Sequence, residues 1–398
     1  MSDLPVLIAG AGPAGCTVAL YLAQRGRPVL LFESEETLPL DLRASTFHPP
    51  SLDLLDSLDV TRRLIPLGLK SPTYQYRDRR TGEAATFDLA VLGGETAHPY
   101  RLQCEQYKMT QVVCDMLREL PAAHVHFAHC VEDVKQDAAG VTAIVSTPEG
   151  PREFRGSYMV GCDGASSRVR KAIGVEYEGF TYPEKFLVVS TPFDFPAHFP
   201  GLTNVNYISD PEEWCVILKT LTLWRVLFPT APEDTEERLL SDDYIQARLR
   251  HLVPGPASFE VVHRTLYRVH QRVAATYRVG RVVLAGDAAH INNPLGGMGM
   301  NGGLHDAFNL SDKLLQILAG NAGEELLDLY DRQRRAVALQ FVQEHTIRNK
   351  RLMEEKDPQL QRARQQEFMR TAADPELARR FLMKTSMIQS LRDCAAIR

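Results

Sequence analysis

The sequence predicts an α/β protein: a Rossmann-like βαβ domain, an inserted domain built on a mixed β-sheet, and a helical C-terminal region. Three observations support this. A glycine-rich turn follows an apolar run near the start of the chain, strand-like segments dominate residues 181–275, and residues 331–398 have helical periodicity. The chain is long enough to bury more than one core.

The first element is the apolar run Pro5–Ala9, which suits a buried parallel strand. A glycine-rich turn follows it, and then a helical pattern begins. The turn consists of Gly10, Ala11, Gly12, Pro13, Ala14 and Gly15. A second apolar run, residues 29–32, ends at Glu33. A glycine-rich turn between a strand and a helix, followed by an acidic residue, is typical of dinucleotide binding.

Each of these residue types has a physical role in such a site. Gly10 permits the tight turn, Gly12 lets the backbone approach a diphosphate, and Gly15 lets the helix pack against the strand. The helix N-terminus directs free N–H groups and a positive dipole end toward the diphosphate. Glu33 would accept hydrogen bonds from ribose hydroxyls and would repel a 2′-phosphate, so we expect FAD or NAD here rather than NADP.

Two later segments carry further glycine and aspartate motifs. Cys162-Asp163-Gly164 and Gly286-Asp287 each end an apolar run, where an aspartate suits a ribose or ribityl hydroxyl. A turn rich in glycine and proline follows the second motif and leads to a helix that we expect to start near Asn301. The turn contains Pro294, Leu295, Gly296, Gly297, Gly299 and Met300. Its N–H groups should form a site for an anion.

In this order and spacing, the three motifs resemble those of the single-component (class A) FAD-dependent aromatic monooxygenases, the para-hydroxybenzoate hydroxylase-like family. The resemblance covers residues 4 to about 335. It implies a non-covalent FAD, with NADH or NADPH as reductant and O2 as co-substrate. The residues it implies as FAD contacts are Gly10, Gly12, Pro13, Ala14, Gly15, Glu33, Arg43, Gln106, Asp163, Asp287, Gly297, Gly299, Met300 and Asn301.

The same resemblance implies a reaction. A flavin C4a-hydroperoxide would hydroxylate a small aromatic or heteroaromatic ring, such as a phenol or a hydroxypyridine. Pro294, Leu295 and Gly296 would form the flavin-side floor of the active site, with the N–H groups of about Met300 and Asn301 directed at the flavin N1–C2=O edge. We expect the substrate side to involve His48, Tyr207, Trp214 and Arg225. No arginine matches the family's carboxylate clamp, so a benzoate substrate is not supported.

The resemblance also divides the chain. We expect an FAD-binding domain at 1–180, with 71–100 as a candidate excursion into the substrate domain. A substrate-binding sheet domain should follow at 181–275, then a return to the FAD domain at 276–330 and a helical region at 331–398. In that last region, Asp374 and Pro375 mark a helix start, and an apolar face should be formed by Leu377, Phe381, Ile388 and Leu391.

Composition limits the other function classes. The net charge of −5 argues against a nucleic-acid binder that relies on bulk charge. We find no apolar run of membrane-spanning length, no secretory signal pattern and no metal-ligand cluster in the sequence. We expect a cytoplasmic protein that is a monomer or a homodimer. Two alternatives stay open: a non-hydroxylating FAD oxidoreductase similar to polyprenoid reductases, and a flavin-bound protein without turnover.

Overall fold

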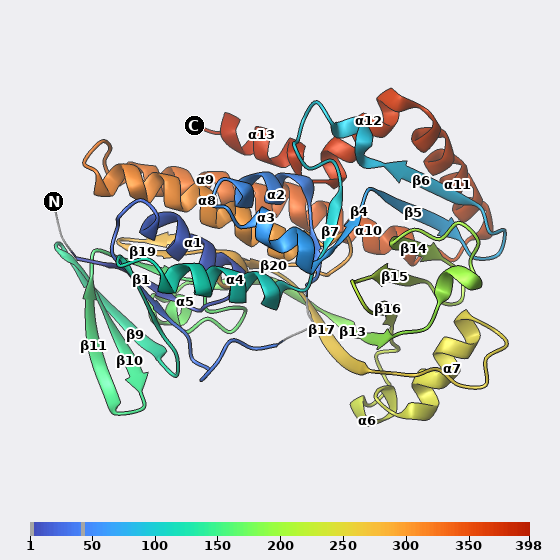
Figure 1. The fold of residues 1–398 in the computed structure, drawn as a ribbon, viewed down its shortest axis with the longest axis horizontal. Coiled ribbons are helices and arrows are strands. Elements are labelled where there is room, and N and C mark those ends of the chain that lie inside the picture. The colour runs from blue at the N-terminus through green and yellow to red at the C-terminus, as the bar shows by residue number, and fades with distance from the viewer. Residues whose placement is uncertain (1–3, 41–43) are drawn as a thin grey trace.

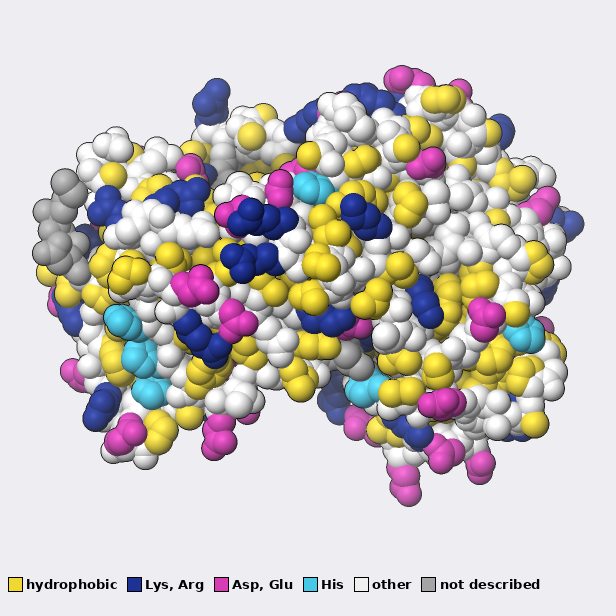
Figure 2. Space-filling view, viewed as in Figure 1, with side chains coloured by type: hydrophobic (Ala, Val, Ile, Leu, Met, Phe, Trp, Pro, Cys, Tyr) yellow, Lys and Arg dark blue, Asp and Glu magenta, His cyan; other side chains and the backbone are white. Residues whose placement is uncertain are grey.

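A computed structural model describes residues 4–40 and 44–398. Arg43, which we expected to contact FAD, lies outside these described residues. Figure 1 shows two lobes: one is built on a six-stranded sheet and the other on an eight-stranded sheet, with the long strands β13 and β17 running between them. Charged side chains of both signs are interspersed over the face shown in Figure 2. Among the described helices, none is both long and apolar enough to cross a membrane.

The six-stranded sheet is mostly parallel. Its strands in spatial order are β18 (Arg278–Val279), β19 (Val282–Leu284), β12 (Tyr158–Gly161), β1 (Val6–Ala9), β2 (Val29–Phe32) and β8 (Ala123–His126). Three helices pack together over it: α1 (Pro13–Ala23), α4 (Gln106–Arg118) and α8 (Met298–Leu318). An antiparallel sheet packs against β1 and β12: β9 (Cys130–Asp137), β10 (Gly140–Thr147) and β11 (Gly150–Gly156). All of β1 is buried, because helices and a second sheet cover it.

The eight-stranded sheet is mixed, as the sequence predicted. Its order is β20 (His290–Ile291), β17 (His263–Ala274), β13 (Tyr177–Thr191), β16 (Trp224–Pro229), β15 (Cys215–Lys219), β14 (Val205–Ser209), β5 (Thr73–Asp78) and β6 (Ala84–Asp88). Alternate side chains of β16 face opposite sides. Trp224 and Val226 pack in one cluster with Leu249 of α7 (Asp242–Leu252), whereas Leu227 packs in another with Leu295.

The C-terminal region is helical, as expected. It contains α9 (Glu325–Val337), a π-helical segment (Ala338–Gln343), α10 (Glu344–Met353), α11 (Pro358–Ala373), α12 (Pro375–Thr385) and α13 (Ile388–Ala396). The Asp374 side chain caps α12 by accepting the N–H groups of Glu376 and Leu377. Helices α11 and α12 pack on β5, β6 and the turn after β6 (Figure 1). The predicted apolar face was wrong at Leu377, which is 42% exposed; Leu382, in the next helical turn, is buried instead.

A third, small sheet lies between the two lobes. Its strands are β3 (Thr46–Phe47), β7 (Arg101–Gln103) and β4 (Leu69–Ser71), with β7 in the middle. Helix α2 (Pro49–Asp56) follows β3 directly and packs on α8. In the chain, β3 precedes β5 and β6, and β7 follows them, so this sheet joins the two lobes. The glycine-rich turn at 294–297 lies next to the same sheet.

Candidate functional site

Four sequence motifs meet at one edge of the six-stranded sheet. Strands β1, β2, β12 and β19 are parallel, and their last residues stand in register: Ala9 pairs with Phe32 and Gly161, and Gly161 pairs with Leu284. The carboxyl ends of parallel strands open onto the same crevice. The glycine turn, Glu33, the Asp163 loop and the Asp287 loop therefore surround a single crevice.

The glycine turn has the geometry that a dinucleotide requires. Gly10 has φ of +93°, and a Cβ there would lie 2.5 Å from the Cys162 carbonyl oxygen. A Cβ on Gly15 would lie 2.0 Å from the Gly10 carbonyl oxygen. A Cβ on Gly12 would meet no described heavy atom within 4 Å, and no side chain caps α1, whose N-cap is Gly12. Backbone N–H groups at this end thus face open space, which suits a diphosphate.

Glu33 is held in place by its neighbours. Its Oε2 accepts the Ala11 N–H at 2.9 Å, and its Oε1 accepts the Glu35 N–H at 3.1 Å. The side chain is 9% exposed. The carboxylate therefore ties the glycine turn to the end of β2, and its contact with an adenosine ribose remains a prediction.

The Asp163 loop is shaped by a helix cap. One Asp163 oxygen accepts the Ser167 hydroxyl at 2.5 Å, and the other accepts the N–H groups of Arg168 and Val169 at 2.7 and 3.1 Å. These groups begin α5 (Arg168–Ala172). Asp163 thus orders the loop beside the crevice, and a direct contact with a cofactor remains a prediction.

Two residues that our sequence analysis missed join the Asp163 and Asp287 loops. Arg170 is 4% exposed and donates to the carbonyls of Ala165 and Ala288, at 2.8 and 2.9 Å. Its guanidinium carbon lies 3.8 Å from the centre of the Tyr177 ring, and the Tyr177 hydroxyl donates to the Asp287 carbonyl at 2.9 Å. Arg170 lies next to the recognised motif, but its partner is more than 100 residues away in the chain, so only the folded structure reveals the link.

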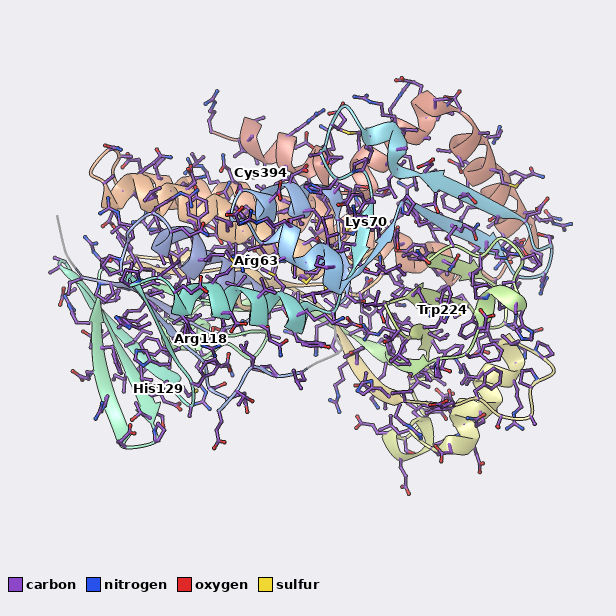
Figure 3. The ribbon with its side chains drawn as sticks, in the orientation of Figure 1. Arg63, Lys70, Arg118, His129, Trp224 and Cys394 are labelled. Atoms are coloured by element: carbon purple, nitrogen blue, oxygen red, sulfur yellow. The ribbon has the colours of Figure 1, made fainter. Side chains whose placement is uncertain are left out.

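A buried cluster of charged residues supports the Gly286-Asp287 loop. Asp306 of α8 accepts the Gly286 N–H at 3.1 Å, His290 Nε2 at 2.7 Å and Arg334 Nε at 2.6 Å. Burial alone would raise the pKa of Asp306, but the charges of His290 and Arg334 hold it below its usual range. Arg334 of α9 is 1% exposed and also contacts Cys394 of α13. Figure 3 labels Cys394. The Gly286-Asp287 loop is therefore anchored through its backbone.

The predicted flavin-side turn is a tight turn. The Gly297 N–H donates to the Pro294 carbonyl at 3.0 Å, with Leu295 and Gly296 between them. Gly296 has φ of +104°, the value that a type II turn requires at its third position, and Gly297 has φ of +66°. Leu295 is 2% exposed and packs in the buried cluster on the eight-stranded sheet. The turn thus belongs to both lobes.

The helix after this turn begins earlier than we predicted. It starts at Met298, with Gly297 as N-cap, rather than near Asn301, because Gly299 is accommodated in the helix. The N–H groups without a helical acceptor are consequently those of Met298, Gly299 and Met300. Asn301 is fully buried, and its side chain accepts the His48 N–H and donates to the carbonyls of Thr46 and Gly297, at 2.7 to 2.9 Å. It therefore holds β3 against α8.

His48 fixes the same turn from the other side. Its Nε2 lies 2.8 Å from the Gly296 carbonyl oxygen, which can only accept, so Nε2 carries the proton. Burial, and then the charge of Arg101, lowers the pKa of His48 well below its usual value. The ring is therefore neutral and acts as a hydrogen-bond donor to the turn.

The remaining predicted substrate residues lie on the face of the eight-stranded sheet that meets this turn. Arg225 is 5% exposed and donates to the Ser45 hydroxyl at 3.2 Å. Trp214 packs edge-on against Phe186, with ring centres 5.7 Å apart, in the same cluster as Leu295.

Gln106, the predicted flavin contact, begins α4, and its backbone N–H donates to the Ala44 carbonyl oxygen at 2.9 Å.

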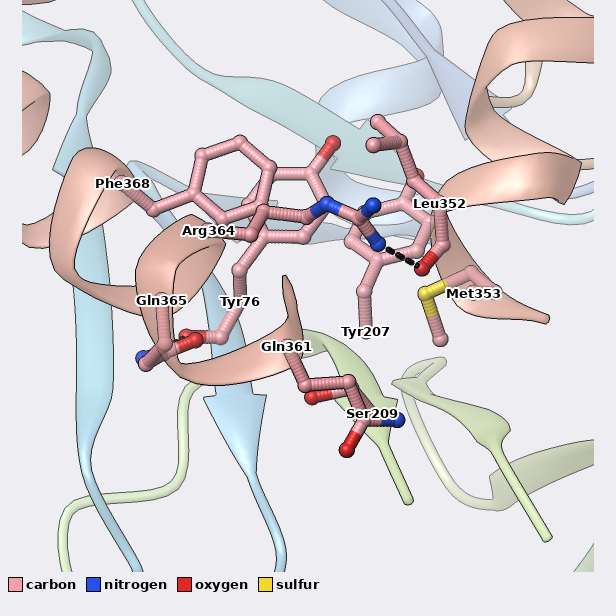
Figure 4. A pocket seen from close by; sticks show the side chains of 9 residues that line it. All are labelled: Tyr76, Tyr207, Ser209, Leu352, Met353, Gln361, Arg364, Gln365 and Phe368. Carbon is pink, nitrogen blue, oxygen red and sulfur yellow. Dashed lines mark hydrogen bonds between the residues drawn. The ribbon is translucent and has the colours of Figure 1, made fainter. Parts of the chain in front are cut away.

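Tyr207 lies further along this face, beneath the C-terminal helices. Its ring stacks on Tyr76 at 5.0 Å, and Tyr76 stacks on Phe368 of α11 at 4.2 Å. These rings line a cavity of about 20 Å³, enough for a single water molecule (Figure 4). Arg364 crosses the cavity and donates to the Leu352 carbonyl. The C-terminal region thus closes the far end of the sheet face.

The chain is similar to known proteins over most of its length. A profile of the family described as FAD binding domain matches residues 3–345. Para-nitrophenol 4-monooxygenase of Pseudomonas sp. strain WBC-3 is 35% identical over 397 residues, which cover 97% of this chain and 96% of that protein. The 6-hydroxy-3-succinoylpyridine 3-monooxygenase of Pseudomonas putida strain DSM 28022 / S16 is 31% identical, covering 89% and 90%. The crystal structure of p-nitrophenol 4-monooxygenase from Pseudomonas putida DLL-E4 superposes with a TM-score of 0.91 at 34% identity, covering 98% of both chains.

Proposed function

The chain belongs to the FAD binding domain family and is an FAD-dependent monooxygenase, and we propose that it uses NADH or NADPH and O2 to hydroxylate a small phenol- or hydroxypyridine-like ring. One observation carries the proposal. The Pro294–Gly297 turn joins the crevice of the six-stranded sheet to the buried apolar face of the other lobe. A flat ring bound beside this turn would therefore meet an aromatic substrate on its far side.

The described residues fit FAD along the whole crevice. Gly12 and the uncapped N-terminus of α1 would hold the diphosphate, and Glu33 would accept the ribose hydroxyls of adenosine. Asp287 lies on the other side of the crevice, where it would meet the ribityl chain. The N–H groups of Met298, Gly299 and Met300 would face the N1–C2=O edge of the ring, since the α8 N-terminus has no side-chain cap.

Bound FAD would take electrons from NADH or NADPH and activate O2 for insertion into the substrate ring. The chain's own residues orient and enclose the reactants. His48 and Asn301 hold the turn and β3 in fixed positions, and the N-terminus of α8 favours negative charge at its end. Leu295, Trp214 and Phe186 keep water from the apolar side of the site.

The proposal is tested by following NADH or NADPH oxidation and O2 uptake with a panel of phenols and hydroxypyridines. We expect the purified protein to hold one FAD per chain and at least one ring substrate to accelerate both rates together with formation of a hydroxylated product. Oxidation of the nicotinamide without any hydroxylated product would favour a non-hydroxylating oxidoreductase. Bound FAD without reduction by either nicotinamide would favour a protein without turnover.

A further inference from the structure

The small sheet between the lobes turns one face toward the flavin-side turn. Thr46 and Leu69 pair with Gln103 across the strands, and Ser71 pairs with Arg101, so these side chains share a face. A Cβ on Gly297 would lie 3.3 Å from the Thr46 Cβ. Arg101 and Gln103 thus project from β7 on the side where the turn and His48 lie.

This face carries buried polar groups that lack partners. The Arg101 side chain is 2% exposed, and its guanidinium makes no hydrogen bond or ion pair with any residue in 4–40 or 44–398. Gln103 is fully buried; its Oε1 accepts the Thr46 hydroxyl at 2.8 Å, whereas its Nε2 has no acceptor among those residues. His48 Nδ1 and Ser71 Oγ are also buried and unpartnered within the described chain.

The Arg101 guanidinium lies over an aromatic ring. Its guanidinium carbon is 4.0 Å from the centre of the Tyr74 ring, and Tyr74 is fixed by a hydrogen bond of 3.0 Å to Thr385 of α12. Its charge also acts on His48, whose pKa is lowered first by burial and then by Arg101. The guanidinium is therefore placed within electrostatic reach of the His48 ring that holds Gly296.

A buried arginine without an anion is costly. Arginine keeps its proton at any physiological pH, and burying a charge without compensation is strongly unfavourable. Glu105, the acidic residue that follows β7, is already paired with Lys108 at 2.7 Å and so does not neutralise Arg101. An anion bound beside the Arg101 guanidinium would relieve this cost.

We propose that the Arg101 guanidinium binds the anionic oxygen of the ring substrate. The inference rests on the proposed function, since it places the substrate ring beside this face and next to the flavin-side turn. The ligand is an aromatic anion, and its charged oxygen belongs either to a phenolate or to a carboxylate. An oxyanion paired with Arg101 would also orient the ring, because the guanidinium binds oxygens in a fixed plane.

The test compares ligand binding in Arg101→Met with binding in the parent protein, using FAD-loaded protein, no nicotinamide, and isothermal titration calorimetry. The ligands are 4-nitrophenol at a pH where it is ionised, its neutral methyl ether 4-nitroanisole, and benzoate. We expect Arg101→Met to raise the Kd of 4-nitrophenol roughly 10- to 100-fold, as for loss of a charged hydrogen bond. The Kd of 4-nitroanisole should change less than about threefold on the same reasoning. If benzoate binds the parent more tightly than 4-nitrophenol does, and Arg101→Met raises its Kd by the same factor, the charged oxygen is a carboxylate.

A matched control is Arg77→Met. Arg77 is 7% exposed, lies on β5 with its side chain on the opposite face from Tyr74 and Tyr76, and donates to the Pro200 carbonyl at 3.1 Å. The Arg77→Met variant should have the parent's Kd values for 4-nitrophenol, 4-nitroanisole and benzoate. Arg101→Lys keeps the charge but loses the planar donors, so it should raise the Kd of ionised 4-nitrophenol less than Arg101→Met does. If Arg101→Met does not fold, Arg101→Lys takes its place in the test.

Three results would overturn the inference: a Kd for 4-nitrophenol within twofold of the parent, an equal loss for 4-nitrophenol and 4-nitroanisole, or a loss of FAD with no selective change in ligand binding. None of these results bears on whether the parent protein consumes a nicotinamide and O2. A parent protein that holds no FAD would instead contradict the proposed function itself.

Discussion

His48 Nε2 lies 2.8 Å from the carbonyl oxygen of Gly296, a residue 248 positions later in the chain. The bond links the end of β3 to the turn on which the flavin ring is proposed to rest. Because the His48 ring is fully buried and neutral, it donates this hydrogen bond without adding charge beside the turn. The position of the turn thus depends on two segments that the sequence keeps far apart.

The first prediction follows from this bond. His48→Phe keeps a ring but leaves the Gly296 carbonyl without its donor, which should cost about 1–3 kcal/mol of unfolding free energy. The turn should also lose its fixed position, so the fraction of NAD(P)H oxidation that yields hydroxylated product should fall. Urea unfolding and product analysis measure the two effects. Unchanged stability and unchanged coupling would show that the bond does not hold the turn.

The second prediction concerns the adenosine end. Glu33→Ala removes the acceptor for the Ala11 N–H as well as the proposed ribose contact, so FAD affinity should fall by about 1–3 kcal/mol. Titration of the apoprotein with FAD, followed by fluorescence quenching, measures it. Glu35→Ala, at the neighbouring exposed position, is the control and should bind FAD like the parent. An unaltered FAD affinity in Glu33→Ala would refute the adenosine assignment.

The parts of the site that the sequence predicted are those defined by local pattern. Gly10, Gly12 and Gly15 follow a strand and begin a helix within a few residues, so their conformations depend on neighbours in the chain. The parallel order of the strands then brings Glu33 and Asp287 to the same crevice. The helix start near Asn301 was wrong because glycine-rich segments were read as turn, whereas Gly299 lies inside α8.

The third prediction uses Gly299. A Cβ there would meet only Asn292 Oδ1 at 3.4 Å, an ordinary contact, so Gly299→Val should fold and retain some FAD. Its side chain should nevertheless displace the flavin ring from the N-terminus of α8 and lower both hydroxylation and the flavin reduction potential. Spectroelectrochemical titration measures the potential, with Gly94→Ala, at a site with open space around its Cβ, as control. A variant with the parent's turnover and potential would show that Gly299 does not adjoin the ring.

The fourth prediction is a pH dependence of stability. Burial, and then the charge of Arg334, lowers the pKa of His305 to about 3. As pH falls below about 6.5, the unfolded chain takes up a proton that the folded chain does not, so stability falls. Between about pH 6.5 and 5, the unfolding free energy of His305→Gln should fall less steeply than that of the parent, by about 1 kcal/mol per pH unit.

Urea unfolding of both proteins at about pH 7.5, 6.0 and 5.0 measures this difference, because these values span the ordinary pKa of histidine. The glutamine side chain of the His305→Gln variant would keep a donor toward the Ser51 hydroxyl, which lies 3.0 Å from His305 Nε2. The two proteins should therefore be comparable at the highest pH. Parallel stability curves for the two proteins would mean that His305 does not contribute to the acid sensitivity.

The parts of the site that the sequence left unpredicted depend on tertiary contacts. Arg101 follows no motif, and only the pairing of β7 with β3 and β4 places it beside His48. Arg334 lies in a helical pattern that resembles a solvated face, yet it is buried against Asp306. Leu377 was assigned to a buried face from helical spacing alone, but the contact surface of α12 is set by the turn after β6 and by α11, which no local pattern specifies.

The central claim, that this chain inserts an oxygen atom from O2 into an aromatic ring, is tested most directly with ¹⁸O2. The FAD-loaded protein is given NADH or NADPH and the ring substrate that most accelerates O2 uptake, and the product is analysed by mass spectrometry. We predict that one ¹⁸O atom appears in each molecule of hydroxylated product. Oxidised nicotinamide with no ¹⁸O in any ring product would contradict the account.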